Sequence, residues 1–331
     1  MLKQKKVYFW ASDMRMNSGE GMLALKFIKD LKKNFKKYKF ISINNVKIEN
    51  YNSFYSKYLK PIFCIFLLWK YHLQGHRVAY INYLPIWNFI IFALIPSFTI
   101  LGPITGTCYN RNFNFKTKLK FFFLEKIFYK ITIFFLSYKW NKLLFSTNML
   151  YFIIPKKIHY KCKFNYVLSD FNLIKKRKKK RKKGAKFLIY YRNHSSKYNF
   201  NFLEQISKLS LFYPTASYGD NFNNANIKNY GKISKNKLIK LMNEYNFTFN
   251  SLENLHNFHF LNSIQNNLNI FCDINLKKFN FYFKFKNIFF IDFNKKDLFK
   301  KIRKQINKKI SSNTNKDKIN LSFRSYFESI K

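Results

Sequence analysis

Apolar positions in the first half of the chain follow two alternating patterns. Short apolar runs at 6–11, 40–43 and 78–83 are typical of buried strands. Between them lie longer segments in which apolar residues recur three or four positions apart, as Leu23 and Phe27 do, with lysines on the other face. Strands that alternate with amphipathic helices predict a mostly parallel sheet with helices on both faces.

The same alternation begins again near residue 186. The strands expected in this half are 186–191, 211–218, 246–251, 269–273 and 288–292. The helices expected between and after them are 200–209, 235–245, 252–265 and 295–310. Two such halves predict an α/β fold of two Rossmann-like domains that face each other across a cleft. Ligands of open α/β sheets bind at the carboxyl ends of the strands, so we expect the active site there.

A run of nine consecutive Lys and Arg residues, 175–183, lies between the two halves. Like charges repel one another and cannot share a core, so the run predicts an exposed linker that also suits a membrane surface or phosphate groups. The expected organisation is a domain over 1–170, a basic linker over 171–185, a second domain over 186–310 and a C-terminal tail over 311–331. Packing of that tail against the first domain is an open alternative.

The charge balance of the 331 residues is strongly basic, with 62 Lys and Arg against 15 Asp and Glu and a net charge of +47. Such a chain attracts nucleic acid, anionic membranes or phosphorylated substrates. Enrichment in Lys, Asn, Ile and Phe together indicates A/T-rich codon usage, which leaves part of this charge without functional meaning. The sequence contains no recognisable nucleic-acid-binding module. A non-catalytic protein that binds nucleic acid or another polyanion is the main alternative to an enzyme.

Cysteine spacing and hydropathy bear on the compartment. The 4 cysteines are scattered and form no CxxC pair, which fits a reducing cytoplasm. The apolar stretch 84–101 is nearly long enough to span a bilayer, but Pro96 and several polar residues interrupt it. We favour a helix at 87–95 followed by a strand at 98–101, and keep a membrane span as an alternative.

Polar and glycine residues follow the predicted strands of the second half. Arg192 and Lys197 come directly after the strand 186–191, and Gly219 comes directly after the next strand. Gly231 and Ile233 come shortly before the helix predicted at 235–245. Further along, Glu253 and Asn254 follow the strand 246–251, and Asn262 stands eight positions after Asn254.

In order and spacing, these pieces resemble the donor-binding domain of the retaining nucleotide-sugar glycosyltransferases of GT-B fold (glycosyl transferases group 1, family 4-like). The resemblance covers roughly 186–275 and implies that Arg192 and Lys197 contact the donor diphosphate. A leaving nucleoside diphosphate gains negative charge, which an Arg fork and a Lys ammonium can stabilise. Gly219, Gly231 and Ile233 are then expected near the nucleotide.

The chain departs from the family pattern at two positions. Asn254 and Asn262 stand where the family has two carboxylates, and Glu253 comes one residue early. Three alternatives remain open: Glu253 replaces the missing carboxylate through a local shift, the chain belongs to a divergent branch, or its activity is reduced. As candidate donor-binding residues, Asn254 and Asn262 can still hydrogen-bond sugar or ribose hydroxyls.

Two loops of the first half are candidates for the acceptor or phosphate site. Ser18, Gly19, Glu20 and Gly21 follow the first strand, where glycines let the backbone approach a reaction centre. Ser18 as the N-cap of the next helix is an equal alternative. Gly102 and Thr105 follow a later strand and either shape the acceptor site or form a tight turn.

The resulting hypothesis is a hexosyltransferase-like enzyme that moves a sugar from a nucleotide-diphosphate donor to a glycan or lipid-linked acceptor of cell-envelope polysaccharide synthesis.

 The resemblance implies transfer with retention at the anomeric carbon and no cofactor besides the nucleotide-sugar substrate. His256 and His259 lack further ligands nearby and are expected to be ordinary helix side chains, so no metal site is predicted. The expected location is the cytoplasm, with peripheral attachment to an anionic inner membrane face as an open alternative, and no specific nucleic acid as a partner.

Overall fold

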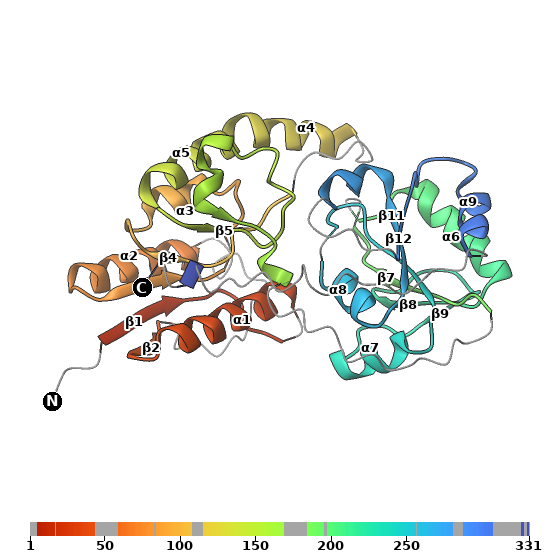
Figure 1. Cartoon of the computed structure of the whole chain (residues 1–331), viewed down its shortest axis with the longest axis horizontal. Helices are drawn as coiled ribbons and strands as arrows, with labels where there is room; N and C mark the ends of the chain where they lie inside the picture. Colours follow the sequence, from red (N-terminus) through yellow and green to blue (C-terminus); the bar gives the residue numbers. More distant parts are fainter. Residues whose placement is uncertain are drawn as a thin grey trace. The chain divides into compact units, whose positions relative to one another are not determined.

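The structure of the protein is a computed structural model, in which the chain divides into two compact units (Figure 1). Unit 1 comprises Met1–Cys108, Phe122–Val167 and Ser322–Lys331, and unit 2 comprises Tyr109–Phe121 and Leu168–Leu321. The residues that the structure describes are 5–16, 18–43, 59–82, 84–107, 115–168, 184–194, 197–255, 257–280, 287–306, 326–327 and 330. The predicted linker 171–185 lies almost entirely outside the described residues.

Unit 1 contains a parallel sheet of four strands in the order β2-β1-β3-β4. These strands are β1 (Lys5–Trp10), β2 (Tyr38–Ser42), β3 (Arg77–Tyr80) and β4 (Ile100–Leu101). Val7 of the central strand β1 pairs with Phe40 on one side and with Arg77 on the other. A two-stranded parallel ladder follows, formed by β5 (Leu143–Leu144) and β6 (Cys162–Lys163).

Helices cover both faces of this sheet. The helical elements of unit 1 and the segment leading into it are α1 (Gly19–Asn34), α2 (Lys60–Leu73), α3 (Phe89–Leu94), α4 (Phe115–Phe123), the π-helical η2 (Leu124–Phe128), α5 (Tyr129–Lys139), and the 3-10 turns η3 (Lys156–Lys161) and η4 (Tyr166–Leu168). Right-handed crossovers from β1 to β2 and from β2 back to β3 run in opposite directions, so α1 covers one face and α2 the other. Figure 1 shows α2, α3 and α5 together on the side away from α1.

Aromatic side chains fill the core of unit 1 and bring the chain's end back to it. Trp10 and Tyr80 are fully buried, with ring centroids 4.5 Å apart. Near the C-terminus, Tyr326 donates a hydrogen bond of 3.2 Å from its hydroxyl to the Leu101 carbonyl. The neighbouring Phe327 packs on Phe27 with centroids 5.7 Å apart. The burial of these two late aromatic residues ties β4 and α1 to the chain end.

Unit 2 contains a parallel sheet of six strands in the order β12-β11-β10-β7-β8-β9. The strands are β7 (Phe187–Tyr191), β8 (Thr215–Gly219), β9 (Ile227–Asn229), β10 (Phe247–Phe249), β11 (Asn269–Asp273) and β12 (Ile288–Ile291). Numbered within the unit, this is the order 3-2-1-4-5-6 of the dinucleotide-binding Rossmann sheet. β9 is a strand that the hydrophobic pattern did not predict.

The helices of unit 2 pack on both faces of the sheet. They are α6 (Phe200–Phe212), α7 (Lys235–Met242), α8 (Phe258–Gln265), η5 (Ile274–Phe279, a 3-10 turn) and α9 (Leu298–Ile306). One face is built from stacked phenylalanines, with Phe249 in contact with Phe187 and Phe271 at centroid distances of 5.6 and 5.3 Å. On the other face Leu188 packs with Leu241 of α7.

Two of the predicted segments had different outcomes. The helix expected from 252 is wrong at its start, because α8 begins only at Phe258, after its N-cap Asn257. Asparagine side chains in the intervening loop bond to the backbone and so compete with helix formation. The stretch 84–101 does divide into α3 and β4, as the α/β interpretation predicts. Within the described residues, every helix is too short or too polar to cross a bilayer.

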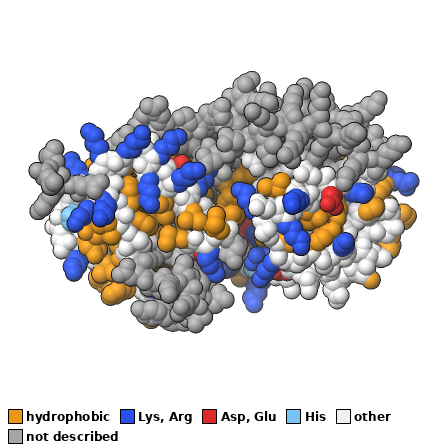
Figure 2. Space-filling model, turned by 90° about the horizontal axis from the view of Figure 1, so that it is seen from below, with side chains coloured by type: hydrophobic (Ala, Val, Ile, Leu, Met, Phe, Trp, Pro, Cys, Tyr) orange, Lys and Arg blue, Asp and Glu red, His pale blue; other side chains and the backbone are white. Residues whose placement is uncertain are grey.

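The charge of the chain is visible on its surface. Figure 2 shows one face, on which Lys and Arg side chains are scattered among hydrophobic ones and Asp and Glu appear at only a few points. The salt bridges between described residues involve only a few of the 62 cations, among them Lys208 with Glu204 and Lys301 with Asp297. With 15 Asp and Glu against 62 Lys and Arg, the chain's own carboxylates can neutralise only a minority of its positive charge.

Candidate functional site

The strand order of unit 2 reverses direction between β7 and β10, which are neighbours in its sheet. In open α/β sheets, the loops on either side of such a switch point diverge and leave room for a ligand at the carboxyl ends of the strands. The two loops at this position are 192–199, which follows β7, and 250–257, which follows β10. We call them the switch-point loops.

Contacts between Lys197 and two consecutive residues hold the switch-point loops together. The backbone N–H of Leu252 donates a hydrogen bond of 2.9 Å to the carbonyl of Lys197. The Lys197 ammonium forms an ion pair with the carboxylate of Glu253. Their side chains are 31% and 26% exposed, so the pair lies at the surface of the site, within reach of a ligand. The structure thus brings together two of the three residues predicted to be catalytic.

The ammonium of Lys197 is partly desolvated. Burial lowers its pKa to about 8, and the positive charge of Arg192 acts in the same direction. The carboxylate of Glu253 favours the charged form, so the two groups remain an ion pair at neutral pH. A cation in this condition gains stability from any anion that replaces the water it has lost.

Arg192, the third predicted catalytic residue, bonds to Asp220 at the end of the neighbouring strand β8. Its Nε lies 3.5 Å from Oδ2 of Asp220, and the Asn193 backbone N–H donates to the same oxygen at 3.0 Å. The Arg192 side chain is 51% exposed, so this pair is open to solvent. Asp220 was not among the predicted site residues, although its position directly after a strand was a usable signal.

Gly219 lets the ends of β7 and β8 approach each other. Its φ is +108°, and a Cβ at this position would lie 2.2 Å from the carbonyl oxygen of Tyr191. Only glycine fits here without displacement of the backbone. Asp220 then donates a backbone hydrogen bond of 2.9 Å to the Tyr191 carbonyl, which fixes its carboxylate next to Arg192.

Gly231 and Ile233 lie in the connection from β9 to α7. Gly231 has a φ of +62° and open space around it, and its carbonyl accepts a hydrogen bond of 2.9 Å from Gly219. Ile233 is half-buried and packs against the hydrophobic cluster that includes Leu238. Ser234 caps α7 by accepting a hydrogen bond from the Lys237 backbone. These contacts connect the segment to the end of β8.

Hydrogen bonds among three asparagines shape the second switch-point loop. The buried Asn250 donates from Nδ2 to the Asn254 carbonyl at 2.8 Å and accepts from Asn257 Nδ2 at 2.8 Å. Asn254 therefore lies in this loop, ahead of α8, whereas Asn262 lies within α8, where its carbonyl accepts from Asn266 at 2.7 Å. Both remain predicted donor-binding residues.

His259 is a buried structural residue of α8. Its Nδ1 lies 2.5 Å from the Tyr218 hydroxyl and its Nε2 lies 2.8 Å from the Thr248 hydroxyl. Thr248 donates its own proton to the Leu188 carbonyl, so Nε2 must donate to Thr248 and Nδ1 must accept from Tyr218. Burial lowers the pKa of His259 to about 4 and keeps the ring neutral. His256 lies outside the described residues, which contain no group of three or more metal-binding side chains.

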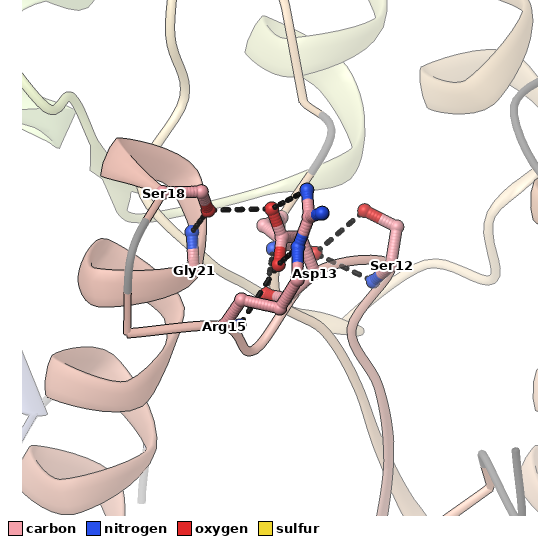
Figure 3. Close-up of polar contacts among 6 residues, drawn as sticks. Ser12, Asp13, Arg15, Ser18 and Gly21 are labelled. Atoms are coloured by element: carbon pink, nitrogen blue, oxygen red, sulfur yellow. Dashed lines mark hydrogen bonds and ion pairs between the residues drawn. The ribbon is translucent and has the colours of Figure 1, made fainter. Parts of the chain in front are cut away.

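In unit 1, the loop after β1 is organised by the buried Asp13, which the sequence analysis missed (Figure 3). Its carboxylate accepts hydrogen bonds from Arg15 Nε and Nη2 at 3.1 Å each, and from the Ser18 hydroxyl at 2.5 Å. Burial raises the pKa of Asp13, but the hydrogen bonds from Arg15 and Ser18 outweigh it and hold the pKa below its ordinary value. Asp13 is therefore ionised at neutral pH.

Ser18 and Gly21 shape the start of α1. The Ser18 hydroxyl accepts from the Gly21 backbone N–H at 2.8 Å, so Ser18 is the N-cap, as one of the two alternatives predicts (Figure 3). A Cβ on Gly21 would lie 2.2 Å from the Arg15 carbonyl oxygen, which explains the glycine. Gly19 is exposed at the first turn of the helix.

Glu20, in the first turn of α1, is a second carboxyl group near Asp13, and its pKa is shifted in the opposite direction. Burial, and then the negative charge of Asp13, raise its pKa. Its Oε2 is buried and has no hydrogen-bond partner among the described residues. Two neighbouring carboxyl groups whose pKa values are pushed apart are suited to hold and transfer a proton.

Gly102 and Thr105 lie at the end of β4. A Cβ on Gly102 would lie 1.7 Å from the Ile81 carbonyl oxygen, so this glycine permits close contact with the end of β3. Thr105 uses its backbone carbonyl to accept from Ile86 at 2.9 Å. Asn82, which also follows β3, accepts from the Ser12 backbone N–H at 2.7 Å and links this edge to the loop after β1.

No protein-family model matches the sequence, and no curated protein matches it. Among solved structures, the chain is similar to the UDP-GlcNAc 2-epimerase of Methanocaldococcus jannaschii, in complex with UDP-GlcNAc and UDP, with 10% identity and a TM-score of 0.52 over 98% of this chain and 99% of that one. It is also similar to Anabaena Alr3699/HepE, in complex with UDP and glucose, with 8% identity and a TM-score of 0.50 over 98% and 95%.

A glycosyltransferase from Rickettsia africae also aligns, at 14% identity and a TM-score of 0.49 over 99% and 93%. At these identities the comparisons bear on fold alone. The first two cover nearly the whole of both chains, and unit 2 has the Rossmann strand order. The predicted resemblance is thereby confirmed at the level of fold: the chain has the GT-B fold of two Rossmann-like domains.

Proposed function

We propose that the chain is a glycosyltransferase that takes its sugar from a nucleoside-diphosphate donor bound at the switch-point loops of unit 2. The observation that carries the proposal is the pairing of Lys197 with Glu253 at the reversal point of a Rossmann sheet, where nucleotides bind in this architecture. Two similar structures were solved with UDP-containing ligands, which supports a nucleotide-sugar donor.

In this proposal the donor diphosphate replaces the carboxylate partners of two cations. Arg192 and Lys197 each face a carboxylate: the Arg192 pair is open to solvent and contributes only about 0–1 kcal/mol, whereas Lys197 and Glu253 are half-buried. A diphosphate brings more negative charge than one carboxylate and can accept the Arg192 fork at two oxygens. It therefore competes well for both cations and leaves Glu253 and Asp220 free to accept hydrogen bonds from donor hydroxyls.

Sugar transfer breaks the bond between the anomeric carbon and the β-phosphate oxygen and forms a bond to an acceptor hydroxyl oxygen. The two cations stabilise the charge that grows on the leaving diphosphate. The acceptor hydroxyl gives up its proton to a base as the new bond forms. Retention at the anomeric carbon and transfer without a metal ion are part of the proposal.

The acceptor is assigned to unit 1 and to the class of glycans or lipid-linked sugars. Hexosyl specificity, a role in cell-envelope polysaccharide synthesis and attachment to the inner membrane face belong to the same proposal. The main alternative, a non-catalytic polyanion-binding protein, gains nothing from the fold. A second candidate is epimerisation of a nucleotide sugar without transfer, which the likeness to the epimerase favours.

A thermal-shift screen with UDP-, GDP-, ADP- and dTDP-sugars tests the donor class. A ligand at about 100 times its Kd stabilises the folded state by about 2.7 kcal/mol, which is readily measured. We expect one nucleotide class to raise the Tm of the wild type and not that of Arg192→Ala/Lys197→Ala. Release of the nucleoside diphosphate that requires an added acceptor supports transfer, whereas conversion of the donor sugar without an acceptor supports epimerisation. No response to any nucleotide sugar contradicts both.

A further inference from the structure

One side of the helix formed by η2 and α5 exposes apolar side chains. Ile127, Phe134 and Tyr138 are 48%, 62% and 86% exposed, and their spacing places them along one stripe of the helix. The rings of Phe134 and Tyr138 are nearly parallel, with centroids 6.2 Å apart. The opposite side, with Tyr129 and Leu136, is buried in the core of unit 1.

Exposed apolar side chains continue over the helices next to α5. Phe63 and Phe66 of α2 are 57% and 66% exposed, and Leu94 of α3 is 44% exposed. α2 is in direct contact with α3, because Trp69 of α2 donates a hydrogen bond of 2.7 Å to the Leu94 carbonyl, and α3 in turn packs on α5. Figure 1 shows α2, α3 and α5 on the same side of the unit 1 sheet. Soluble proteins rarely expose large apolar side chains in such a group without a partner.

A groove of about 460 Å³ runs along the stripe, between α5 and the segment 153–158. Its walls include the apolar side chains of Phe134 and Ile153. Three lysines also line it: Lys126, Lys130 and Lys157. None of the three forms an ion pair with another residue of the described chain, and the groove's one acidic lining residue is Glu125. The groove thus combines apolar walls with unneutralised positive charge.

We propose that unit 1 docks on an anionic phospholipid bilayer through this surface, which consists of Phe63, Phe66, Leu94, Ile127, Phe134 and Tyr138 with the three groove lysines. The positive charge of the surface favours an anionic bilayer as its binding partner. Lysines beside exposed aromatic rings match the phosphate level and the outer acyl region of a bilayer, where a lysine stem lies along apolar surface with its ammonium in the headgroups. A second copy of the same surface would place its lysines against these lysines and be repelled.

This surface is the part of the protein through which the membrane attachment of the proposed function would take place. Its biological purpose therefore rests on the proposed function. Its measurement does not need sugar transfer. Lipid binding can be detected when no donor or acceptor is present, and turnover on a soluble acceptor can be measured without lipid. Failure of one proposal is therefore distinguishable from failure of the other.

Co-sedimentation of the full chain with vesicles tests the proposal. We compare pure phosphatidylcholine vesicles with vesicles that contain about one third phosphatidylglycerol, whose surface attracts each nearby lysine by about 1 kcal/mol. Because a chain of net charge +47 can bind anions anywhere, the decisive comparison is between variants of equal charge. The test variants are Phe134→Ser/Tyr138→Ser and Lys126→Gln/Lys130→Gln/Lys157→Gln.

The matched controls lie in unit 2. Phe200→Ser/Leu211→Ser removes apolar side chains that are 83% and 65% exposed, and Lys235→Gln/Lys237→Gln/Lys300→Gln removes three exposed lysines. We expect partitioning onto the anionic vesicles to fall about tenfold or more for both test variants and less than about twofold for both controls. Equal losses in test and control variants, or no binding of the wild type to anionic vesicles, would overturn the proposal. Unchanged Tm values of all four variants show that folding is not the cause.

Discussion

The backbone N–H of Leu252 lies 2.9 Å from the carbonyl oxygen of Lys197, and this hydrogen bond joins the two switch-point loops of unit 2. It fixes the position of Lys197 relative to Glu253, which follows Leu252 in the chain and binds the lysine ammonium. A site built on two connected loops at adjacent strand ends can hold a charged ligand in one geometry.

Replacement of Lys197 by Ala should lower kcat for sugar transfer by about 100-fold or more, because a preorganised cation no longer stabilises the leaving diphosphate. The variant should still fold, because Glu253 is partly open to solvent and can be hydrated when its partner is removed. The matched control is Lys208→Ala, which also removes a lysine that is ion-paired to a glutamate. Equal turnover of the two variants would remove Lys197 from the proposed site.

Gly219→Ala should destabilise the fold strongly. The new Cβ would meet the Tyr191 carbonyl at 2.2 Å, at a φ of +108° that residues with a Cβ rarely adopt. We expect the free energy of unfolding to fall by about 2–4 kcal/mol in urea titration. Gly231→Ala is the control, because its φ of +62° has open space around it and costs only about 1–2 kcal/mol. A smaller loss for Gly219→Ala than for Gly231→Ala contradicts this geometry.

Stability should depend on pH through His259. Its folded pKa is about 4, below its ordinary value of 6.5, so the folded state binds fewer protons than the unfolded state between these values. The contribution of the neutral ring is present above pH 6.5 and is lost as the pH falls towards 4, by about 3 kcal/mol in total. Urea titrations at several pH values should therefore show a steeper acid loss for the wild type than for His259→Gln. Parallel curves would show that His259 does not titrate in this way.

Glu20→Gln should raise stability at neutral and higher pH. The folded pKa of Glu20 is raised, so its deprotonation in the buried site costs stability as the pH rises through that value. A neutral amide removes this cost. Thermal unfolding at pH 4, below the ordinary glutamate pKa of 4.5, and at pH 9 measures the effect: the gain over the wild type should be larger at the higher pH. A gain that does not change with pH would mean that Glu20 does not titrate in the folded protein.

Local pattern was sufficient for the fold class and for most elements. The strand 269–273 matches β11 residue for residue. The start of α8 could not be predicted, because Asn250 reaches across the loop to the Asn254 carbonyl and to Asn257. The short strand β9 was also not predicted, because only one of its three residues, Ile227–Asn229, is buried.

Most residues of the candidate site were predicted from their positions after strand ends, but the pairing between them was not. Arg192 and Lys197 were found from their position after β7. Their carboxylate partners, Asp220 and Glu253, come from the ends of two other strands, and only the strand order brings them close. Asp13 was missed because nothing in its local sequence shows that Arg15 and Ser18 bond to it.

The affinity of the nucleoside diphosphate, measured by isothermal titration calorimetry, tests the central claim most directly. The ligand is the diphosphate of whichever nucleotide class responds in the thermal-shift screen, and the proteins are the wild type, Arg192→Ala, Lys197→Ala and the control Lys208→Ala. We predict that Kd rises about tenfold or more for each of the two site variants, equivalent to about 1.4 kcal/mol, and stays within about twofold for the control. Equal affinity of all four proteins would contradict a diphosphate site at the switch-point loops.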